Sequence, residues 1–211
     1  FDALCSSMIF SHYLDSLNIK HKIIHTGIIG KTFEGFFDFS KIEQETDIKD
    51  IDLSAFDLII LTDCSSANKI SKEPYFSVPK NIVTINIDHH PSNNYYGTYN
   101  YVFPYGSTCT VIYQLFQKLN IDLSKEYLKM IFLGICTDTG FFRFSSTCSK
   151  DFRFTAEIME KGVSIHEILD KFKDKETLDE IKYKQIIYKN LKINKDKKYA
   201  YSTITQKEIL D

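Results

Sequence analysis

The sequence predicts an α/β fold in which helices flank a mostly parallel sheet. Residues 56–63 and 81–87 contain short, continuous apolar runs, which are typical of strands buried on both faces of such a sheet. The segments around these runs place apolar residues at helical spacing instead. Because strands and helices alternate along the chain, we expect the layered architecture of an α/β domain.

The first elements lie before residue 50. Residues 3–17 repeat apolar side chains at helical spacing, so we expect a helix there. Residues 22–25 are a short strand candidate. Residues 27–50 contain glycine and polar residues and show only weak periodicity.

The central segment supplies the two buried strands and two further helices. A loop is expected over residues 91–106, which are rich in Asn, Tyr, Gly and Pro. A helix follows over residues 107–119. The next helix runs to about Cys136, with Ser124 as its N-cap.

The C-terminal third predicts two short helices, over residues 155–161 and 164–172, that are separated at Gly162. A polar helix over residues 176–189 precedes a strand over residues 199–205. We therefore expect three parts: a first domain over 1–172, a helical linker over 173–192, and the start of a second α/β domain over 193–211.

The composition excludes several classes of protein. The 211 residues carry a net charge of −2, which argues against a strongly basic surface that coats nucleic acid. No apolar run approaches the roughly 18 residues that span a bilayer, so we expect no membrane partner. The five cysteines include no C-x-x-C pair, which favours reduced thiols in a cytoplasmic protein over disulfides or a thiolate zinc site.

Acidic and imidazole side chains lie at the ends of the predicted elements, namely Asp2, Asp63, Asp88, His89, His90 and Asp138. Ligands of α/β sheets gather at the carboxyl ends of strands, where Asp63 and the D-H-H triplet stand. Carboxylates with a neutral imidazole suit Mn²⁺ or Mg²⁺. Taken singly, each residue has an ordinary alternative as a helix-end acid, a turn cap or a surface histidine.

Four segments, taken in order, resemble the motifs of the DHH phosphoesterase superfamily. F-D-A-L-C-S-S at the start is similar to the end of its first motif, H-x-x-P-D-x-D-A-x-x-S. L-T-D-C-S around Asp63 resembles the second motif. D-H-H-P-S-N from Asp88 fits the third, D-H-H-x-x-N. G-I-C-T-D-T-G-F-F-R-F around Asp138 is similar to the fourth motif, which reads T-D-T-G-x-F-R-F.

The resemblance implies a role for each matching residue. Asp63 would be the carboxylate that bridges two Mn²⁺ ions, with Mg²⁺ as a substitute, and the further metal ligands would be Asp2, His89 and Asp138. His90 would be a catalytic imidazole, either just outside the metal ligands or facing the substrate, and Asp88 would orient His89 or His90 by a hydrogen bond. Substrate would be bound by Arg143, Asn93 and Ser107.

The form of the fourth motif most resembles the branch that hydrolyses short oligonucleotides and 3′-phosphoadenosine 5′-phosphate by a two-metal mechanism. Short RNA or DNA oligonucleotides or small nucleotides would then be the partners, and a homodimer is a further expectation. Alternatives are a cyclic-di-AMP or pApA phosphodiesterase, a manganese inorganic pyrophosphatase, and an inactive nucleotide-binding module.

Two parts of the family pattern have no match in the sequence. The first His and first Asp of the first motif have no counterpart, and neither has the glycine-rich G-G-G-H segment of the second domain. We therefore expect the chain to be part of a protein of roughly 300 or more residues, with little activity by itself.

Overall fold

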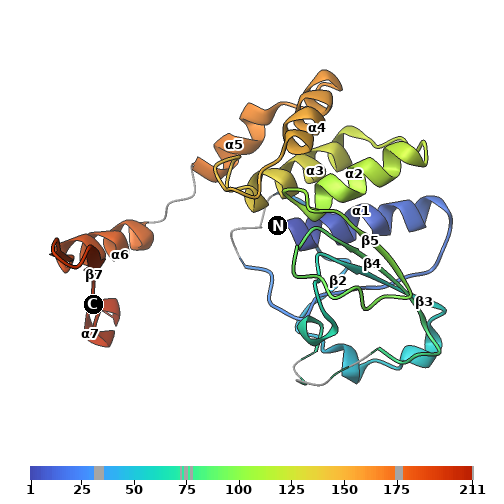
Figure 1. The fold of residues 1–211 in the computed structure, drawn as a ribbon, viewed down its shortest axis with the longest axis horizontal. Coiled ribbons are helices and arrows are strands. Elements are labelled where there is room, and N and C mark those ends of the chain that lie inside the picture. Colours follow the sequence, from blue (N-terminus) through green and yellow to red (C-terminus); the bar gives the residue numbers. More distant parts are fainter. Residues whose placement is uncertain (31–35, 72, 74–75, 77, 174–177, 211) are drawn as a thin grey trace. The chain divides into compact units, whose positions relative to one another are not determined.

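A computed structural model describes residues 1–30, 36–71, 73, 76, 78–173 and 178–210. The chain forms two compact units, Phe1–Ile168 and Leu169–Asp211, which we describe separately (Figure 1). The domain boundaries expected from the sequence stay a prediction.

The first unit is built on a three-stranded parallel sheet. Its strands are β3 (Leu58–Thr62), β4 (Val83–Asp88) and β5 (Tyr99–Val102), in the order β3-β4-β5. In the register of the sheet, Thr62 pairs with Ile87. The carboxyl ends of β3 and β4 therefore lie side by side, which confirms the predicted α/β class and brings the residues after each strand together.

Strand β5 corrects the prediction of a continuous loop over residues 91–106. It pairs in parallel with β4, with Asp88 opposite Val102. Its side chains are only partly buried, as expected for an edge strand, so its sequence lacks the apolar run that marks β3 and β4. A second parallel pair joins β1 (Ile23–Ile24) to β2 (Ile42–Glu43), and β2 is too short to show periodicity.

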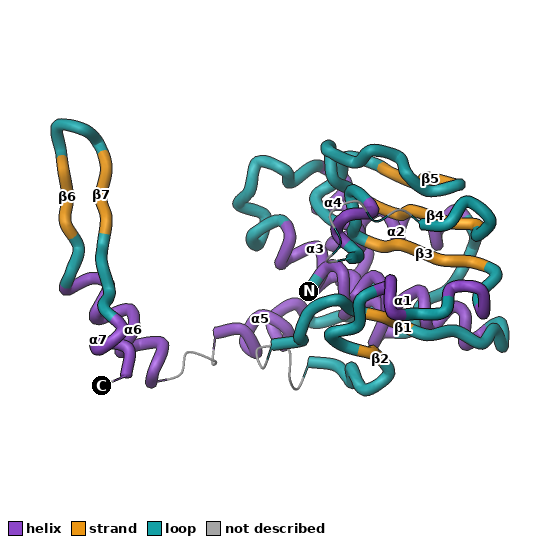
Figure 2. The backbone as a smooth tube through the Cα atoms, turned by 90° about the horizontal axis from the view of Figure 1, so that it is seen from below, coloured by secondary structure: helices purple, strands orange, loops and turns teal. Residues whose placement is uncertain are grey.

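Three helices pack together beside the sheet (Figures 1 and 2): α1 (Asp2–Ser16), α2 (Thr108–Lys118) and α3 (Lys125–Asp138). Their contact surfaces are apolar. The rings of Phe10 and Phe116 meet edge to face at 5.3 Å, and Ile112 and Ile131 are fully buried. This core fixes the first residue of α1 and the last residue of α3 relative to the strand ends.

The remaining helices of the first unit are α4 (Ser149–Glu160) and α5 (Ile165–Lys173), the latter running into the second unit. Helix α4 begins six residues before the expected start at residue 155. Its first turn is closed by a reciprocal cap, in which the Cys148 amide donates to Asp151 at 2.7 Å. Cysteine is outside the usual set of N-cap residues, so the sequence did not indicate this start. Helix α3 likewise extends to Asp138, beyond its expected end near Cys136.

The second unit contains α6 (Leu178–Lys189), the antiparallel pair β6 (Lys192–Asn194) and β7 (Tyr199–Tyr201), and α7 (Gln206–Leu210). The predicted start of the polar helix at residue 176 lies outside the described residues. The predicted strand over 199–205 ends at Tyr201. In the described part of the chain, none of the helices combines the length and apolarity needed to cross a bilayer.

Candidate metal centre

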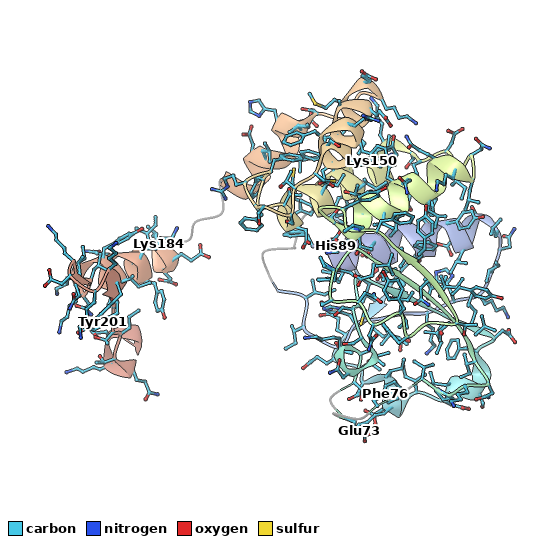
Figure 3. All side chains as sticks on the ribbon, viewed as in Figure 1. Glu73, Phe76, His89, Lys150, Lys184 and Tyr201 are labelled. Carbon is cyan, nitrogen blue, oxygen red and sulfur yellow. The ribbon has the colours of Figure 1, made fainter. Side chains whose placement is uncertain are left out.

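Four elements of the first unit converge at one point. Asp2 opens α1, Asp63 follows β3, His89 follows β4, and Asp138 is the last residue of α3. Potential ligand atoms of Asp2, His89 and Asp138 all lie within 4.8 Å of one another. Asp63 belongs to a second such group, with Asp88, His89 and His90. Figure 3 marks His89, which is common to both groups.

The His89 ring is held so that one nitrogen faces the carboxylates. Its Nδ1–H donates to the backbone carbonyl of Tyr105 at 3.0 Å. Nε2 lies 3.1 Å from Asp138 Oδ2 and 3.5 Å from Asp63 Oδ1. In the neutral imidazole, the form that binds a cation once the ring has lost its second proton, Nε2 carries only a lone pair, and ionised carboxylates cannot donate to it. Nε2 is accordingly a buried atom without a hydrogen-bond partner. A divalent cation would satisfy it, so these residues fit a metal ion.

The Asp2 carboxylate is 2% exposed and lies on the N-terminus of α2. Its oxygens accept the backbone amides of Thr108 at 2.6 Å and Cys109 at 3.0 Å. The helix dipole favours negative charge at this place. Burial opposes it, and together with the charges of Asp63 and Asp138 burial raises the pKa of Asp2 to about 7.

Asp63 has a backbone conformation that few residue types adopt. Its φ of +56° lies in the left-handed region, which Asp and Asn tolerate better than other non-glycine residues. The Asp63 amide continues the sheet by donating to Ile87 O at 3.0 Å, and Thr108 Oγ1 donates to Oδ1 at 3.0 Å. The carboxylate is therefore fixed at the strand end, facing His89.

Asp88 orients His90, one of the two alternatives that the family resemblance left open. His90 Nδ1–H donates to Asp88 Oδ1 at 2.7 Å, which raises the pKa of His90. Asn93 donates to the other oxygen of Asp88 at 2.6 Å. Burial would raise the pKa of Asp88, but these two hydrogen bonds outweigh it and lower the pKa. Through these two hydrogen bonds, Asp88 positions His90.

Asn93 and Ser107, which we expected to bind substrate, are both buried. Asn93 is buried, and its amide donates to Asp88 and to Asn86 Oδ1 at 2.7 Å. Ser107 is fully buried as the N-cap of α2, where it accepts the Thr110 amide at 3.0 Å. Both side chains hold neighbouring residues of the site in place, and their expected contact with a substrate stays a prediction. Arg143 is exposed, as substrate binding would require, and its Nε donates to Gly140 O at 2.8 Å.

The sequence did not indicate that three further residues support the site. Thr108 holds Asp63, and the Tyr105 carbonyl holds His89. The fully buried Asp151 braces the intervening loop by accepting the Gly106 amide at 3.2 Å and the Thr110 hydroxyl at 2.6 Å. A Cβ on Gly106 would overlap Asp151, so only glycine admits the carboxylate here. The small residues between Tyr105 and Thr108 were the available signal.

Cation binding is expected to release protons and to strengthen as the pH rises. Burial alone lowers the pKa of His89, but the carboxylates of Asp138 and Asp63 outweigh it and raise the pKa to about 11. His89, and in part Asp2, thus hold protons near neutral pH that a cation must displace. Calorimetric Mn²⁺ titrations in buffers of different ionisation enthalpy should show about one to two protons released per ion. An affinity that stays constant between about pH 6 and 8 would contradict this protonation scheme.

Comparison with known proteins identifies a family and several relatives of this chain. The DHH family, N-terminal domain, matches residues 1–135. A bifunctional oligoribonuclease and PAP phosphatase, NrnA, of Thermus thermophilus is 35% identical over 95 residues, which are 44% of this chain and 29% of that protein. A probable bifunctional oligoribonuclease and PAP phosphatase NrnA of Streptococcus mutans is 29% identical over 161 residues, 74% of this chain and 49% of that protein.

The fold also has a counterpart among solved structures. An exopolyphosphatase-related protein from Bacteroides fragilis superposes with a TM-score of 0.87 at 22% identity, covering 98% of this chain and 63% of that one. The chain therefore spans less than two thirds of the proteins that it matches. Because the family match covers more than half of the chain and includes Asp2, Asp63 and His89, the resemblance seen in the sequence is confirmed, and the chain belongs to the DHH family.

Proposed function

We propose that this chain forms the metal-binding part of a Mn²⁺-dependent phosphoesterase that hydrolyses short oligonucleotides and 3′-phosphoadenosine 5′-phosphate. The observation that carries the proposal is the buried, unpartnered Nε2 of His89, surrounded by the carboxylates of Asp2, Asp63 and Asp138. The names of the relatives from T. thermophilus and S. mutans support the substrate class.

In this proposal, Asp2, Asp63, His89 and Asp138 would hold the metal. A bound divalent cation supplies Lewis-acid stabilisation of phosphoryl charge and activates water as the nucleophile. Carboxylate oxygens with one imidazole nitrogen are a donor set that Mn²⁺ accepts, and the described residues contribute no thiolate to either ligand group.

His90 is proposed to contact the substrate. Its Nδ1 is committed to Asp88, which fixes the ring plane, and the side chain is 42% exposed. The hydrogen bond to Asp88 favours the protonated imidazole, in which the opposite nitrogen, Nε2, also carries a proton and can donate to a phosphoryl oxygen. Hydrogen bonds of this kind that strengthen in the transition state lower the barrier. Arg143 is the proposed phosphate contact, because a guanidinium matches the geometry of phosphate oxygens.

A substrate panel tests this function. The natural protein that contains this chain, loaded with Mn²⁺, is offered RNA of two to five nucleotides, 3′-phosphoadenosine 5′-phosphate, cyclic-di-AMP, pApA and pyrophosphate. We expect mononucleotide release from the short RNA and phosphate release from 3′-phosphoadenosine 5′-phosphate. The matched control is the same reaction with a chelator.

Each other outcome supports a different alternative. Turnover restricted to cyclic-di-AMP or pApA would point to the second-messenger phosphodiesterases. Turnover of pyrophosphate alone would point to the manganese pyrophosphatases. Binding of nucleotides without any turnover would indicate an inactive binding module.

A further inference from the structure

The turn that follows Asp138 is held in an unusual conformation. Gly140, Phe141 and Phe142 are three consecutive residues with φ between +56° and +64°. Left-handed backbone is unfavourable for bulky side chains, so two successive phenylalanines there must be held by the surrounding structure. The holding residue is the fully buried Thr139, whose carbonyl accepts the amides of Arg143 and Phe144 at 3.0 Å each.

This turn folds the ring of Phe144 back over Gly140. A Cβ on Gly140 would lie 2.5 Å from the ring carbons Cε1 and Cζ, so the ring rests directly on the glycine backbone. Phe144 is nevertheless 55% exposed. An aromatic ring that is supported on one side and open on the other is a surface on which another planar group can stack.

A pair of stacked aromatic rings lies in the same stretch of chain. Phe142 stacks on Phe152 of α4, with ring centroids 4.8 Å apart and planes at 26°. Phe152 is also 55% exposed. Phe141 is 37% exposed, so three exposed phenylalanines lie within 14 residues of Asp138, and such a grouping indicates a role other than core packing.

The basic residues of this segment indicate which kind of ligand binds to the exposed rings. The chain has two arginines, Arg143 and Arg153, and both are in it, whereas every other basic residue is lysine. Arg143 is tied to the turn through Nε and Gly140 O, which holds its guanidinium beside the rings. Exposed aromatics combined with arginine favour single-stranded nucleic acid, because every base offers a face for stacking and every linkage a phosphate.

We propose that Phe144 forms a stacking platform for a nucleobase of the oligonucleotide whose phosphodiester lies at the metal centre, with Phe152 as a second exposed ring in the same segment. The inference rests on the proposed function and adds the base contact to it. The position of Asp138 fixes the position of the platform. Asp138 ends α3, Phe144 follows it by six positions, and backbone hydrogen bonds to Thr139 hold the turn between them.

Binding and turnover of a dinucleotide test the platform. The natural protein is titrated calorimetrically with a diribonucleotide in Ca²⁺, used to suppress hydrolysis, and hydrolysis is then measured in Mn²⁺. For Phe144→Ala we expect the dissociation constant and KM to rise about tenfold or more, with a smaller change in kcat. Phe144→Trp should retain binding. The control is Tyr99→Ala, which removes a 64% exposed ring on the edge strand β5 and should change neither value.

An abasic dinucleotide separates stacking from structural damage. Phe144→Ala should weaken binding of this ligand by less than about twofold, because it has no base to stack. Equal losses for both ligands, or no loss for either, would overturn the platform. If the wild-type protein binds the dinucleotide through Phe144 but does not hydrolyse it, the platform stands and the proposed function falls. If the wild-type protein does not bind the dinucleotide, the platform falls as well.

Discussion

Replacing Asp63 with Asn should reduce metal-dependent turnover about a thousandfold, equivalent to about 4 kcal/mol of transition-state stabilisation. Asn keeps the oxygen that accepts from Thr108 and tolerates the left-handed φ of +56°, so the fold should remain intact. It removes the negative charge that faces His89 at 3.5 Å. The substitution therefore isolates the charge, whereas Asp63→Ala would add backbone strain.

The measurements are calorimetric Mn²⁺ titration and initial rates on a short oligonucleotide. The matched control is Asp57→Asn, at an exposed aspartate before β3, which should leave both unchanged. Mn²⁺ affinity that is unchanged in Asp63→Asn would remove Asp63 from the ligand set. Lower affinity with an unchanged thermal midpoint of the ion-free protein would support its assignment.

Gly134→Ala should destabilise the first unit by about 2–3 kcal/mol and also weaken cation binding. Gly134 lies where α3 packs closely on the start of α1 and α2. A Cβ there would overlap Cys109 Sγ and would lie 2.7 Å from Asp2 Oδ1. Both neighbours are buried and cannot swing into solvent, so the helices must separate or Asp2 must leave its amides on α2.

Urea unfolding of the ion-free protein measures the first effect, as a lower midpoint at constant slope. The control is Gly27→Ala, where the added Cβ would approach His25 no closer than 3.4 Å. Adding Cys109→Ala should restore part of the lost stability, because it removes the sulfur atom that the new methyl group meets. A midpoint of Gly134→Ala equal to that of Gly27→Ala would contradict the close approach.

The sequence predicted the part of the centre that follows buried strands. Asp63 and the D-H-H triplet each come after an apolar run, and parallel strands bring their carboxyl ends to one edge. The fourth motif located Asp138, although its place within the last turn of α3 depends on where that helix stops. The residues that we propose as metal ligands could therefore be identified from the sequence.

The directions of side chains, and contacts between residues that are far apart in the sequence, could not be predicted in this way. The D-H-H-x-x-N pattern identifies Asn93, but only packing shows that its amide points inward to Asp88. Strand β5 was missed because an edge strand with one exposed and one partly buried tyrosine has no continuous apolar run. The contact of Asp2 with α2 joins residues more than 100 positions apart, and no local pattern reports it.

That contact ties the start of the chain to its middle through a carboxylate on two helix amides. Because an unfolded chain holds these groups far apart, only the native state brings the proposed ligands of this chain together. Occupancy and folding are consequently linked equilibria: at a free Mn²⁺ concentration 100 times the dissociation constant, the native state gains about 2.7 kcal/mol. Chelation should withdraw that gain, so the supply of the cation would set how much of the protein survives proteolysis as well as how fast it works.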